Sequence, residues 1–257
     1  MDYTQLFQFS GRRVLVIGAG SGIGRESARA LHAHGATVIC ADRDAASAAA
    51  TASGLGAGAT SLQVDVLDQA AVRAVAGDLP DLAALVFTAA TNVRKRIADY
   101  TLDEFDRVVN LNLRAAFVLI QAFAPAMAAN NGGSIIGFAS IRAVTVEPGQ
   151  GVYAATKAGL VQLLRTAAAE YGPAGVRVNA ISPGVVETPL TAQIKNNPDW
   201  YNAYAAKSAL GRWSTPSELA GAVVYLASDA SRFVTGSVLT VDGGWTAVDG
   251  RFDPPNA

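Results

Sequence analysis

Tyr153 and Lys157 are the two side chains whose types and spacing first suggest chemistry in this sequence. They stand four residues apart in GQGVYAATKAG, residues 149–159, where most other side chains are small. Four residues are about one helical turn, so on a helix both side chains project from one face. An ammonium close to a phenol favours the phenolate and lowers the pKa of the phenol. The alternative is a solvated pair on an alanine-rich helix, and the rest of the sequence distinguishes the two.

A glycine-rich turn near the N-terminus predicts a binding site for a dinucleotide. The stretch VLVIGAGSGIGRESARAL reads as strand, turn and helix, with Gly18, Gly22 and Gly24 in a G-x-x-x-G-x-G spacing. Glycines permit a tight turn, a close approach of the backbone to a pyrophosphate, and close packing of helix on strand. The free N–H groups at the start of the helix attract the anion. No G-K-[ST] follows, which disfavours a P-loop NTPase.

Two aspartates end the next predicted strands and bear on the choice of cofactor. Asp42 in VICADRD can accept hydrogen bonds from both hydroxyls of an adenosine ribose and would repel a 2′-phosphate, which favours NAD over NADP. Arg43 beside it leaves NADP open, because a guanidinium can hold a phosphate. Asp65 in QVDV can accept a hydrogen bond from the adenine amino group. The alternative for both aspartates is an ordinary turn or loop residue.

Short apolar runs alternate with longer helical stretches along the chain. Most runs are continuously apolar, which predicts strands that are buried on both faces of a parallel sheet. This alternation predicts a Rossmann-type α/β fold, a doubly wound, seven-stranded parallel sheet with helices on both faces. The predicted helices lie near 23–34, 44–54, 68–77, 102–129, 152–171 and 216–228. The predicted strands are Val14–Ile17, Thr37–Ala41, Ser61–Val64, Ala84–Thr88, Ser134–Phe138, Arg177–Ala180 and Val238–Val241.

The 257 residues are predicted to form one domain, residues 1–257, because no linker and no repeat divides them. Residues 188–214 interrupt the strand–helix alternation with a polar, aromatic stretch, and we expect them to form a lid over the substrate. Residues 245–257 form a C-terminal extension that contains two prolines, and we expect it to pack on a neighbouring subunit.

Composition argues against several classes of function. The chain is 51% hydrophobic with a net charge of −1, so a large core is expected, and neither nucleic acid nor anionic lipid is an expected partner. The lone Cys40 lies in an apolar run and fits a reducing compartment. The N-terminus lacks a signal pattern, and the apolar segment AAFVLIQAFAPAMAA is too short to span a bilayer. We therefore expect a cytoplasmic protein without a metal site.

Further motifs complete the pattern of a known family. Ser140 lies thirteen residues before Tyr153, Asn112 stands in VVNLNLRAAF, and VNAISPGVVETPL and VTGSVLTVDGG follow later. Together with YAATK and the glycine turn, from about Gly11 to Gly244, they make the chain similar to the single-domain short-chain dehydrogenases/reductases. The resemblance implies an NAD(P)-dependent enzyme that interconverts a secondary alcohol and a ketone. It also implies a homotetramer.

The same resemblance assigns roles to the candidate residues. Tyr153 exchanges a proton with the substrate oxygen, and Ser140 hydrogen-bonds that oxygen. Lys157 holds the nicotinamide ribose and lowers the pKa of Tyr153, and Asn112 anchors a water in a proton relay. A phenol titrates near pH ~10, so its pKa must fall by about three, roughly 4 kcal/mol, to act as a base at neutral pH. The implied cofactor-binding residues are Gly18, Ser21, Gly22, Ile23, Gly24, Asp42, Arg43, Asp65, Val66, Phe87, Ala89, Tyr153, Lys157, Pro183, Gly184, Val186 and Thr188.

Two of these positions need comment. Thr188 precedes a proline, so it also reads as a helix cap, and both readings can hold. The family usually shows N-N-A-G after the fourth strand, where this chain has Phe87, Thr88, Ala89 and Ala90. The change bears on local stability and cofactor affinity rather than on the chemistry. It leaves open a catalytically silent, nucleotide-binding regulator.

The substrate is predicted from basic residues at the ends of two strands. The chain most resembles family members such as gluconate 5-dehydrogenase, deoxygluconate 3-dehydrogenase and polyol dehydrogenases. Arg142 follows Ser140 closely, and Arg94 and Arg96 follow the fourth strand, where the ligand crevice of this fold lies. Because arginine binds carboxylates bidentately, we expect Arg142 and Arg94 or Arg96 to meet a substrate carboxylate, and Glu147 a sugar hydroxyl. The alternatives are solvated charges and an NADPH-dependent reductase of ketoacyl or steroid-like ketones.

Overall fold

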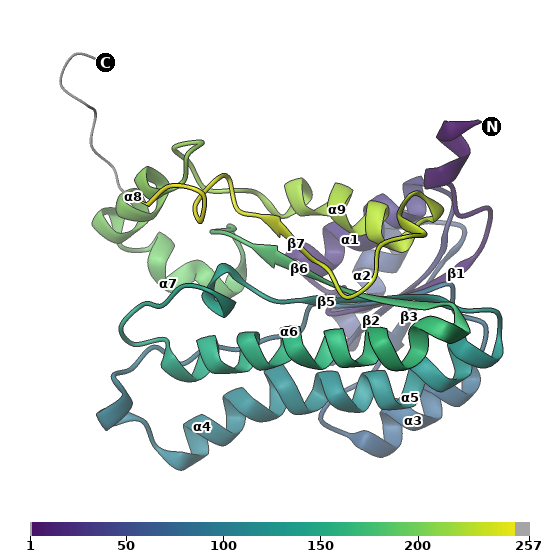
Figure 1. The fold of residues 1–257 in the computed structure, drawn as a ribbon, viewed down its shortest axis with the longest axis horizontal. Helices are drawn as coiled ribbons and strands as arrows, with labels where there is room; N and C mark the ends of the chain where they lie inside the picture. Colours follow the sequence, from purple (N-terminus) through teal and green to yellow (C-terminus); the bar gives the residue numbers. More distant parts are fainter. Residues whose placement is uncertain (1, 250–257) are drawn as a thin grey trace.

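The computed structural model describes residues 2–249 and shows a seven-stranded parallel sheet between two layers of helices (Figure 1). The strand order is β3-β2-β1-β4-β5-β6-β7, so the direction of winding reverses between β1 and β4. Such a reversal opens a crevice at the carboxyl ends of the strands, where dinucleotides bind. The strands are β1 (Arg13–Ile17), β2 (Thr37–Asp42), β3 (Ala59–Gln63), β4 (Ala84–Phe87), β5 (Gly133–Phe138), β6 (Val176–Pro183) and β7 (Val238–Val241).

All seven predicted strands are confirmed, but the two edge strands differ in character from the prediction. The inner strands β1 and β4 are buried along nearly their whole length, as continuous apolar runs predict. Strand β3 is mostly exposed, and most of β7 is only half-buried. Each has a neighbour on one side only, so burial on both faces was the wrong expectation for these two strands.

Alternate residues of the inner strands supply the two apolar layers. In β1, Val14 and Val16 pack with one layer, and Leu15 and Ile17 pack with the other, because successive side chains point to opposite faces. Figure 1 shows the two groups of helices on the two sides of the sheet. The first layer contains α1 (Gly22–Ala33), α2 (Ala45–Leu55) and α9 (Ala220–Ala227), and the second contains α3 (Gln69–Asp78), α4 (Leu102–Val109), α5 (Ala115–Ala129) and α6 (Gly151–Tyr171).

The predicted helix 102–129 changes its hydrogen bonding at mid-length. A π-helical turn, Asn110–Arg114, joins α4 to α5, and the N–H of Ala115 donates to the carbonyl oxygen of Asn110. π-Helical turns are rare and recur at functional sites. Here the turn carries Asn112, which is 2% exposed. The sequence pattern predicts the helix but not this turn.

The whole segment Leu102–Ala129 has 28 residues and is long and apolar enough to cross a membrane by length and composition alone. The expectation that it is too short was wrong, since it considered only the second half of the helix. Half of its most apolar window is buried inside the fold. Its side chains Leu119 and Phe123 belong to the core layer beneath the sheet, which accounts for the apolar composition.

Residues 188–214, which we call the lid segment, are largely helical. A short turn, Pro189–Thr191, leads into α7 (Ala192–Lys195) and α8 (Pro198–Lys207). Figure 1 shows both helices beyond one end of the sheet, away from the N-terminus. The lid segment packs in a third apolar cluster, which includes Ile141 and Trp245. Trp245 therefore packs within its own chain, whereas residues 250–257 lie outside the described residues, and packing of the extension on a neighbouring subunit stays a prediction.

Candidate active site

The glycine turn after β1 has the close contacts that the sequence predicts. Gly18 has a φ of +86°, and a Cβ added to Gly24 would collide with the carbonyl oxygen of Gly18. Ser21 precedes α1 without a side-chain hydrogen bond to it, so the first N–H groups of α1 are not capped by this hydroxyl. Gly22 opens the helix, and Ile23 packs against the first apolar layer. The turn fits a pyrophosphate, which would lie against these N–H groups.

Asp42 lies beside the glycine turn and is held there by two backbone groups. Its Oδ2 accepts a hydrogen bond from the Gly20 N–H at 3.0 Å, and its Oδ1 accepts one from the Asp44 N–H at 3.1 Å. Arg43 and Asp65 are exposed, and both line a surface cavity of about 530 Å³ at the ends of β2 and β3. The side chains predicted to surround the adenosine thus lie along one rim of the sheet.

The stretch that departs from N-N-A-G keeps ties to its neighbours. Thr88 donates from its hydroxyl to the Ile17 carbonyl oxygen at 3.1 Å, which links the end of β4 to β1. Asn112 accepts from the Thr91 N–H at 2.8 Å and donates to the Thr91 carbonyl oxygen at 2.9 Å. The Phe87 ring packs at Gly137 in the core, so only its backbone can face a cofactor. Val66 is also buried, and Ala89 is half-buried.

Ser140, Tyr153 and Lys157 converge at the carboxyl end of β5. The Ser140 hydroxyl lies close enough to the Tyr153 hydroxyl to lower the pKa of that phenol. The Lys157 ammonium lies 5.6 Å from the centre of the Tyr153 ring and donates to the Phe138 carbonyl oxygen at 2.7 Å. All three side chains are buried, because α6 packs its inner face against the sheet. The four-residue spacing on α6 and the end of β5 thus bring a phenol, an ammonium and a hydroxyl together.

Burial and nearby charges shift the pKa of Tyr153 in opposite directions. Burial raises the pKa of Tyr153 above its ordinary value, whereas the hydrogen bond with Ser140 and the charges of Arg94 and Arg142 lower it. The Lys157 ammonium also lies near the Tyr153 ring, and its predicted role in lowering the pKa of Tyr153 stays a prediction. Burial also lowers the pKa of Lys157 itself to about 8.

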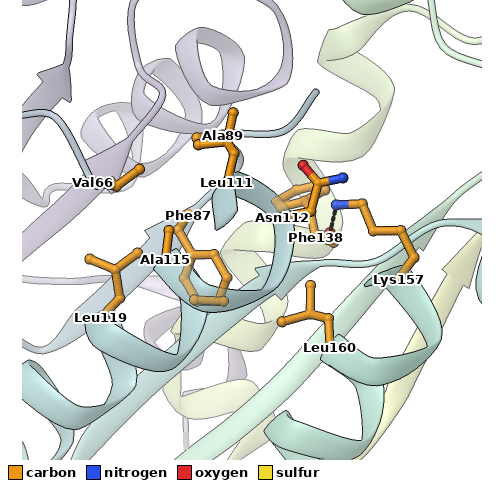
Figure 2. A pocket seen from close by; sticks show the side chains of 11 residues that line it. Val66, Phe87, Ala89, Leu111, Asn112, Ala115, Leu119, Phe138, Lys157 and Leu160 are labelled. Carbon is orange, nitrogen blue, oxygen red and sulfur yellow. Dashed lines mark hydrogen bonds between the residues drawn. The ribbon is translucent and has the colours of Figure 1, made fainter. Parts of the chain in front are cut away.

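A small cavity lies between Asn112 and Lys157 (Figure 2). Its volume of about 10 Å³ has room for a single water molecule. Figure 2 shows the Asn112 carboxamide near the Lys157 ammonium, above Phe138. The carboxamide already bonds Thr91 and donates to the Thr156 hydroxyl at 3.2 Å, so it holds the chain around the cavity. The cavity fits a relay water, whose role stays a prediction.

The segment that follows β6 also lies at the carboxyl end of the sheet, where the crevice is. Pro183 ends β6, and a Cβ on Gly184 would lie 2.7 Å from the Asp242 Cα, so the exits of β6 and β7 touch. Val186 forms a bridge with Ser214. Thr188 stands at the N-cap position of the turn that Pro189 begins, and its N–H donates to the Thr191 hydroxyl at 3.0 Å. The predicted cap position of Thr188 is confirmed, and its contact with nicotinamide stays a prediction.

Comparison with known proteins agrees with this geometry. A family model described as enoyl-(acyl carrier protein) reductase matches residues 18–246. Galactitol 2-dehydrogenase (L-tagatose-forming) of Cereibacter sphaeroides is 38% identical over 252 residues, which cover 96% of this chain and 99% of that protein. Gluconate 5-dehydrogenase of Gluconobacter oxydans is 33% identical over 253 residues, with coverage of 96% and 99%. The chain belongs to the short-chain dehydrogenase/reductase family.

A solved structure of the family has the same fold. The gluconate 5-dehydrogenase of Burkholderia cenocepacia J2315, solved in complex with NADP and tartrate, superposes with a TM-score of 0.92 at 32% identity. The match covers 95% of this chain and 99% of that one. The chain is therefore an NAD(P)-dependent oxidoreductase that interconverts a secondary alcohol and a ketone.

In this dehydrogenase the buried hydroxyls of Ser140 and Tyr153 are the groups expected to handle the proton. A bound nicotinamide cofactor supplies the hydride chemistry. In oxidation the Tyr153 phenolate would take the proton of the substrate hydroxyl, and in reduction the phenol would return it to the carbonyl oxygen. Ser140, whose hydroxyl lies near that of Tyr153, would bond the same oxygen and orient it. Both roles stay predictions.

The predicted substrate residues of the dehydrogenase divide into a paired and an unpaired cation. Arg142 is 7% exposed, forms an ion pair with Glu147 and donates to the Tyr204 hydroxyl at 3.2 Å. Its charge is already compensated, so the expectation that Arg142 meets a substrate carboxylate is not supported, nor is a sugar contact for Glu147. The Nε of Arg94 is buried and has no hydrogen-bond partner among residues 2–249, and its guanidinium lies 5.9 Å from the Trp200 ring centre.

The neighbouring cations Lys95 and Arg96 lie on the surface. Lys95 pairs with Glu104 at 2.6 Å on the surface, and Arg96 is exposed. Two further polar residues were not predicted, the half-buried Asn92 and the buried Gln150. Asn92 donates to the Gln150 side-chain oxygen at 2.8 Å, and the Gln150 amide continues to Glu147. In the sequence only their positions could have pointed to them, since Asn92 stands two residues before Arg94 and Gln150 three residues before Tyr153.

Proposed function

We propose that this dehydrogenase acts on a polyhydroxylated substrate of the sugar-acid or polyol class, and that Arg94 binds the carboxylate of acidic members. The two relatives reported above act, by their names, on galactitol and gluconate, one neutral and one acidic. The names of these relatives support a sugar-acid or polyol substrate. They leave open whether the substrate of this chain is acidic or neutral.

The observation that carries the proposal is the unsatisfied side chain of Arg94. A buried N–H group normally has an acceptor, and the Arg94 Nε has none among the described residues. The charge of its guanidinium lowers the pKa of Tyr153, so the two side chains lie within electrostatic range of each other. It also faces Trp200 of the lid segment. A carboxylate between Tyr153 and α8 would supply the missing acceptor with charge-assisted geometry.

The test compares one acidic and one neutral substrate. We expect Arg94→Met to lower kcat/KM for gluconate by about tenfold to 100-fold, the size of a charge-assisted hydrogen bond, and to lower it much less for galactitol at high pH. Lys95→Met is the matched control, since Lys95 is adjacent but exposed and paired with Glu104. Equal losses on both substrates at high pH would end the carboxylate assignment.

We further propose that NAD is preferred to NADP. The support is the Asp42 carboxylate, which Gly20 and Asp44 hold beside the glycine turn. A carboxylate there accepts ribose hydroxyls and repels a 2′-phosphate. The Burkholderia cenocepacia relative was solved with NADP, so the preference has to be measured on this chain. Rates of nicotinamide reduction with NAD and NADP in parallel decide it, and faster turnover with NADP would reverse the assignment.

We also propose a homotetramer that uses the outer face of α4, α5 and α6. Phe105 and Phe117 are 43% and 48% exposed there, an unusual position for two large apolar side chains. Light scattering should give the mass of four chains, and Phe117→Glu should lower it. A wild-type mass of a single chain would contradict the proposal.

A further inference from the structure

One carboxylate oxygen gathers donors from three segments of the dehydrogenase. The Oε2 of Glu147 accepts from the Arg142 guanidinium, from the Tyr204 hydroxyl, and from the Gln150 amide at 2.5 Å. Arg142 and Tyr204 also bond each other at 3.2 Å, which closes a triangle. Tyr204 lies on α8, whereas Arg142 and Glu147 follow β5, so the triangle ties the lid segment to the end of the sheet.

The same turn after β5 carries Ser140. The Arg142 N–H donates to the Ser140 Oγ at 3.1 Å, within the single helical turn Ile141–Ala143. A displacement of Arg142 would therefore also displace the hydroxyl that orients the substrate oxygen. Contact between the lid segment and Ser140 thus runs through two side chains and one backbone group.

Burial makes each bond of the triangle costly to lose. Arg142 and Tyr204 are 7% and 9% exposed, and the Glu147 side chain between them is 21% exposed. In such surroundings removal of one partner leaves the others unsatisfied, at a cost above that of a surface contact. The Tyr204 ring also packs edge-on against Trp245, with ring centres 5.2 Å apart. The hydroxyl and the ring of Tyr204 therefore both hold α8 against the turn after β5 and Trp245.

We propose that Glu147 is a positioning residue, which fixes the turn of Ser140 and holds α8 against it, and that it does not contact the sugar. This rests on the alcohol–ketone chemistry of the family but not on a particular substrate. A positioning role predicts that loss of the Glu147 charge and loss of the Tyr204 hydroxyl weaken the same contact. Their effects should therefore not add.

Two variants and a matched control test the proposal. Glu147→Gln removes the charge with little change of shape, and Tyr204→Phe removes only a hydroxyl. Tyr201→Phe is the control, because Tyr201 lies on the same helix and its hydroxyl donates to Glu187 at 2.7 Å, away from the Ser140 turn. The chain has three tryptophans, Trp200, Trp213 and Trp245, and all lie in the cluster around α8, so their fluorescence reports this region without any substrate.

We expect acrylamide to quench the tryptophans more strongly in Glu147→Gln and Tyr204→Phe than in wild type and Tyr201→Phe. With galactitol and gluconate, kcat/KM should fall about tenfold, the size of one charge-assisted bond. Tyr204→Phe should act mainly on KM, and Glu147→Gln on KM and kcat. The double variant should be no worse than Glu147→Gln alone. The Kd for NAD, measured by titration, should stay within twofold of wild type.

Unchanged quenching and unchanged kcat/KM in both single variants would overturn the inference, as would losses that add in the double variant. A weaker Kd for NAD in step with the loss of kcat/KM would also overturn it, because it would indicate general damage to the fold. If neither sugar turns over but quenching rises in both variants, the inference stands and the proposed substrate class fails. If Glu147→Gln does not fold, quenching and kinetics of Tyr204→Phe still decide.

Discussion

The ammonium of Lys157 on α6 donates a 2.7 Å hydrogen bond to the carbonyl oxygen of Phe138, the last residue of β5. This bond anchors a buried cation at the point where the sheet meets the crevice. Lys157 forms no ion pair within residues 2–249, and burial lowers its pKa to about 8. The site therefore holds a charge that the fold alone does not favour, in the place where a cofactor ribose is expected.

The first prediction is that Lys157→Met stabilises the protein at pH 7 while it abolishes turnover. The pKa of Lys157 falls from 10.5 to about 8 on folding, so the folded chain binds fewer protons between these pH values. Stability consequently rises with pH across this window, and below pH 8 the full penalty, about 3 kcal/mol, applies. Methionine leaves the Phe138 carbonyl without its donor, so the net gain should be about 1–2 kcal/mol.

Thermal unfolding of both proteins between pH 7 and 9.5 checks this prediction. The advantage of Lys157→Met should shrink as pH rises, because wild type loses its penalty. Lys95→Met should show no such trend, since Lys95 is exposed and paired with Glu104. A stabilisation that stays constant up to pH 9.5 would contradict the account of burial.

The second prediction concerns the pH dependence of alcohol oxidation. Arg94 lowers the pKa of Tyr153 through its charge, and oxidation requires the phenolate. Arg94→Met should therefore move the acid limb of kcat/KM to higher pH, with the largest loss at low pH and recovery at high pH. Galactitol is the substrate of choice, since a neutral polyol separates this effect from carboxylate binding. A limb that stays in place, or that moves to lower pH, would show that Arg94 does not tune Tyr153.

The third prediction tests cofactor choice at Asp42. Asp42→Ser removes the carboxylate that is expected to accept the ribose hydroxyls. The KM for NAD should rise by about tenfold or more, the size of a charge-assisted hydrogen bond, and the ratio of NADP to NAD turnover should increase. Asp44→Ala is the control, because Asp44 caps α2 through the Ala46 and Ser47 N–H groups. The control should cost about 1 kcal/mol of stability without a change in cofactor preference. An unaltered NADP to NAD ratio in Asp42→Ser would remove Asp42 from cofactor selection.

The sequence pattern predicted the strands and helices because burial and turn geometry depend on residues close together in the chain. The continuous apolar run of β4 and the glycines around α1 determine burial and turn geometry within a few residues. The four-residue spacing of Tyr153 and Lys157 placed both on the inner face of α6 for the same reason. The family motifs then extended this pattern to Ser140 and Asn112, which stand in the same crevice.

The sequence pattern could not predict ion pairs and hydrogen bonds between segments that lie far apart in the chain. Arg142 and Arg94 look equivalent in sequence, yet only Arg142 has a carboxylate within reach in the described chain, because α8 and the turn after β5 close around Glu147. The π-helical turn at Asn112 was missed for a similar reason. Its side chain bonds Thr91, 21 residues away, and nothing in the helical periodicity reports such a bond.

The fourth prediction compares two glycines in helices. A methyl group on Gly24 would meet the Gly18 carbonyl oxygen and come within 2.8 Å of the Thr88 hydroxyl, and backbone atoms cannot move aside as a flexible side chain does. Gly54 on α2 has nothing within 4 Å of an added Cβ. Gly54→Ala should therefore be neutral or gain up to about 1 kcal/mol, from helix propensity.

Gly24→Ala should instead cost several kcal/mol, roughly 3–5, because the clash separates α1 from β1, and it should weaken NAD binding in the fraction that folds. Chemical denaturation gives the first quantity and a fluorescence titration with NAD the second. If Gly24→Ala lost stability but kept wild-type affinity for NAD, the turn would serve packing alone. The pyrophosphate would then have to lie elsewhere along the crevice, since a helix N-terminus displaced from β1 could not keep the same geometry toward an anion.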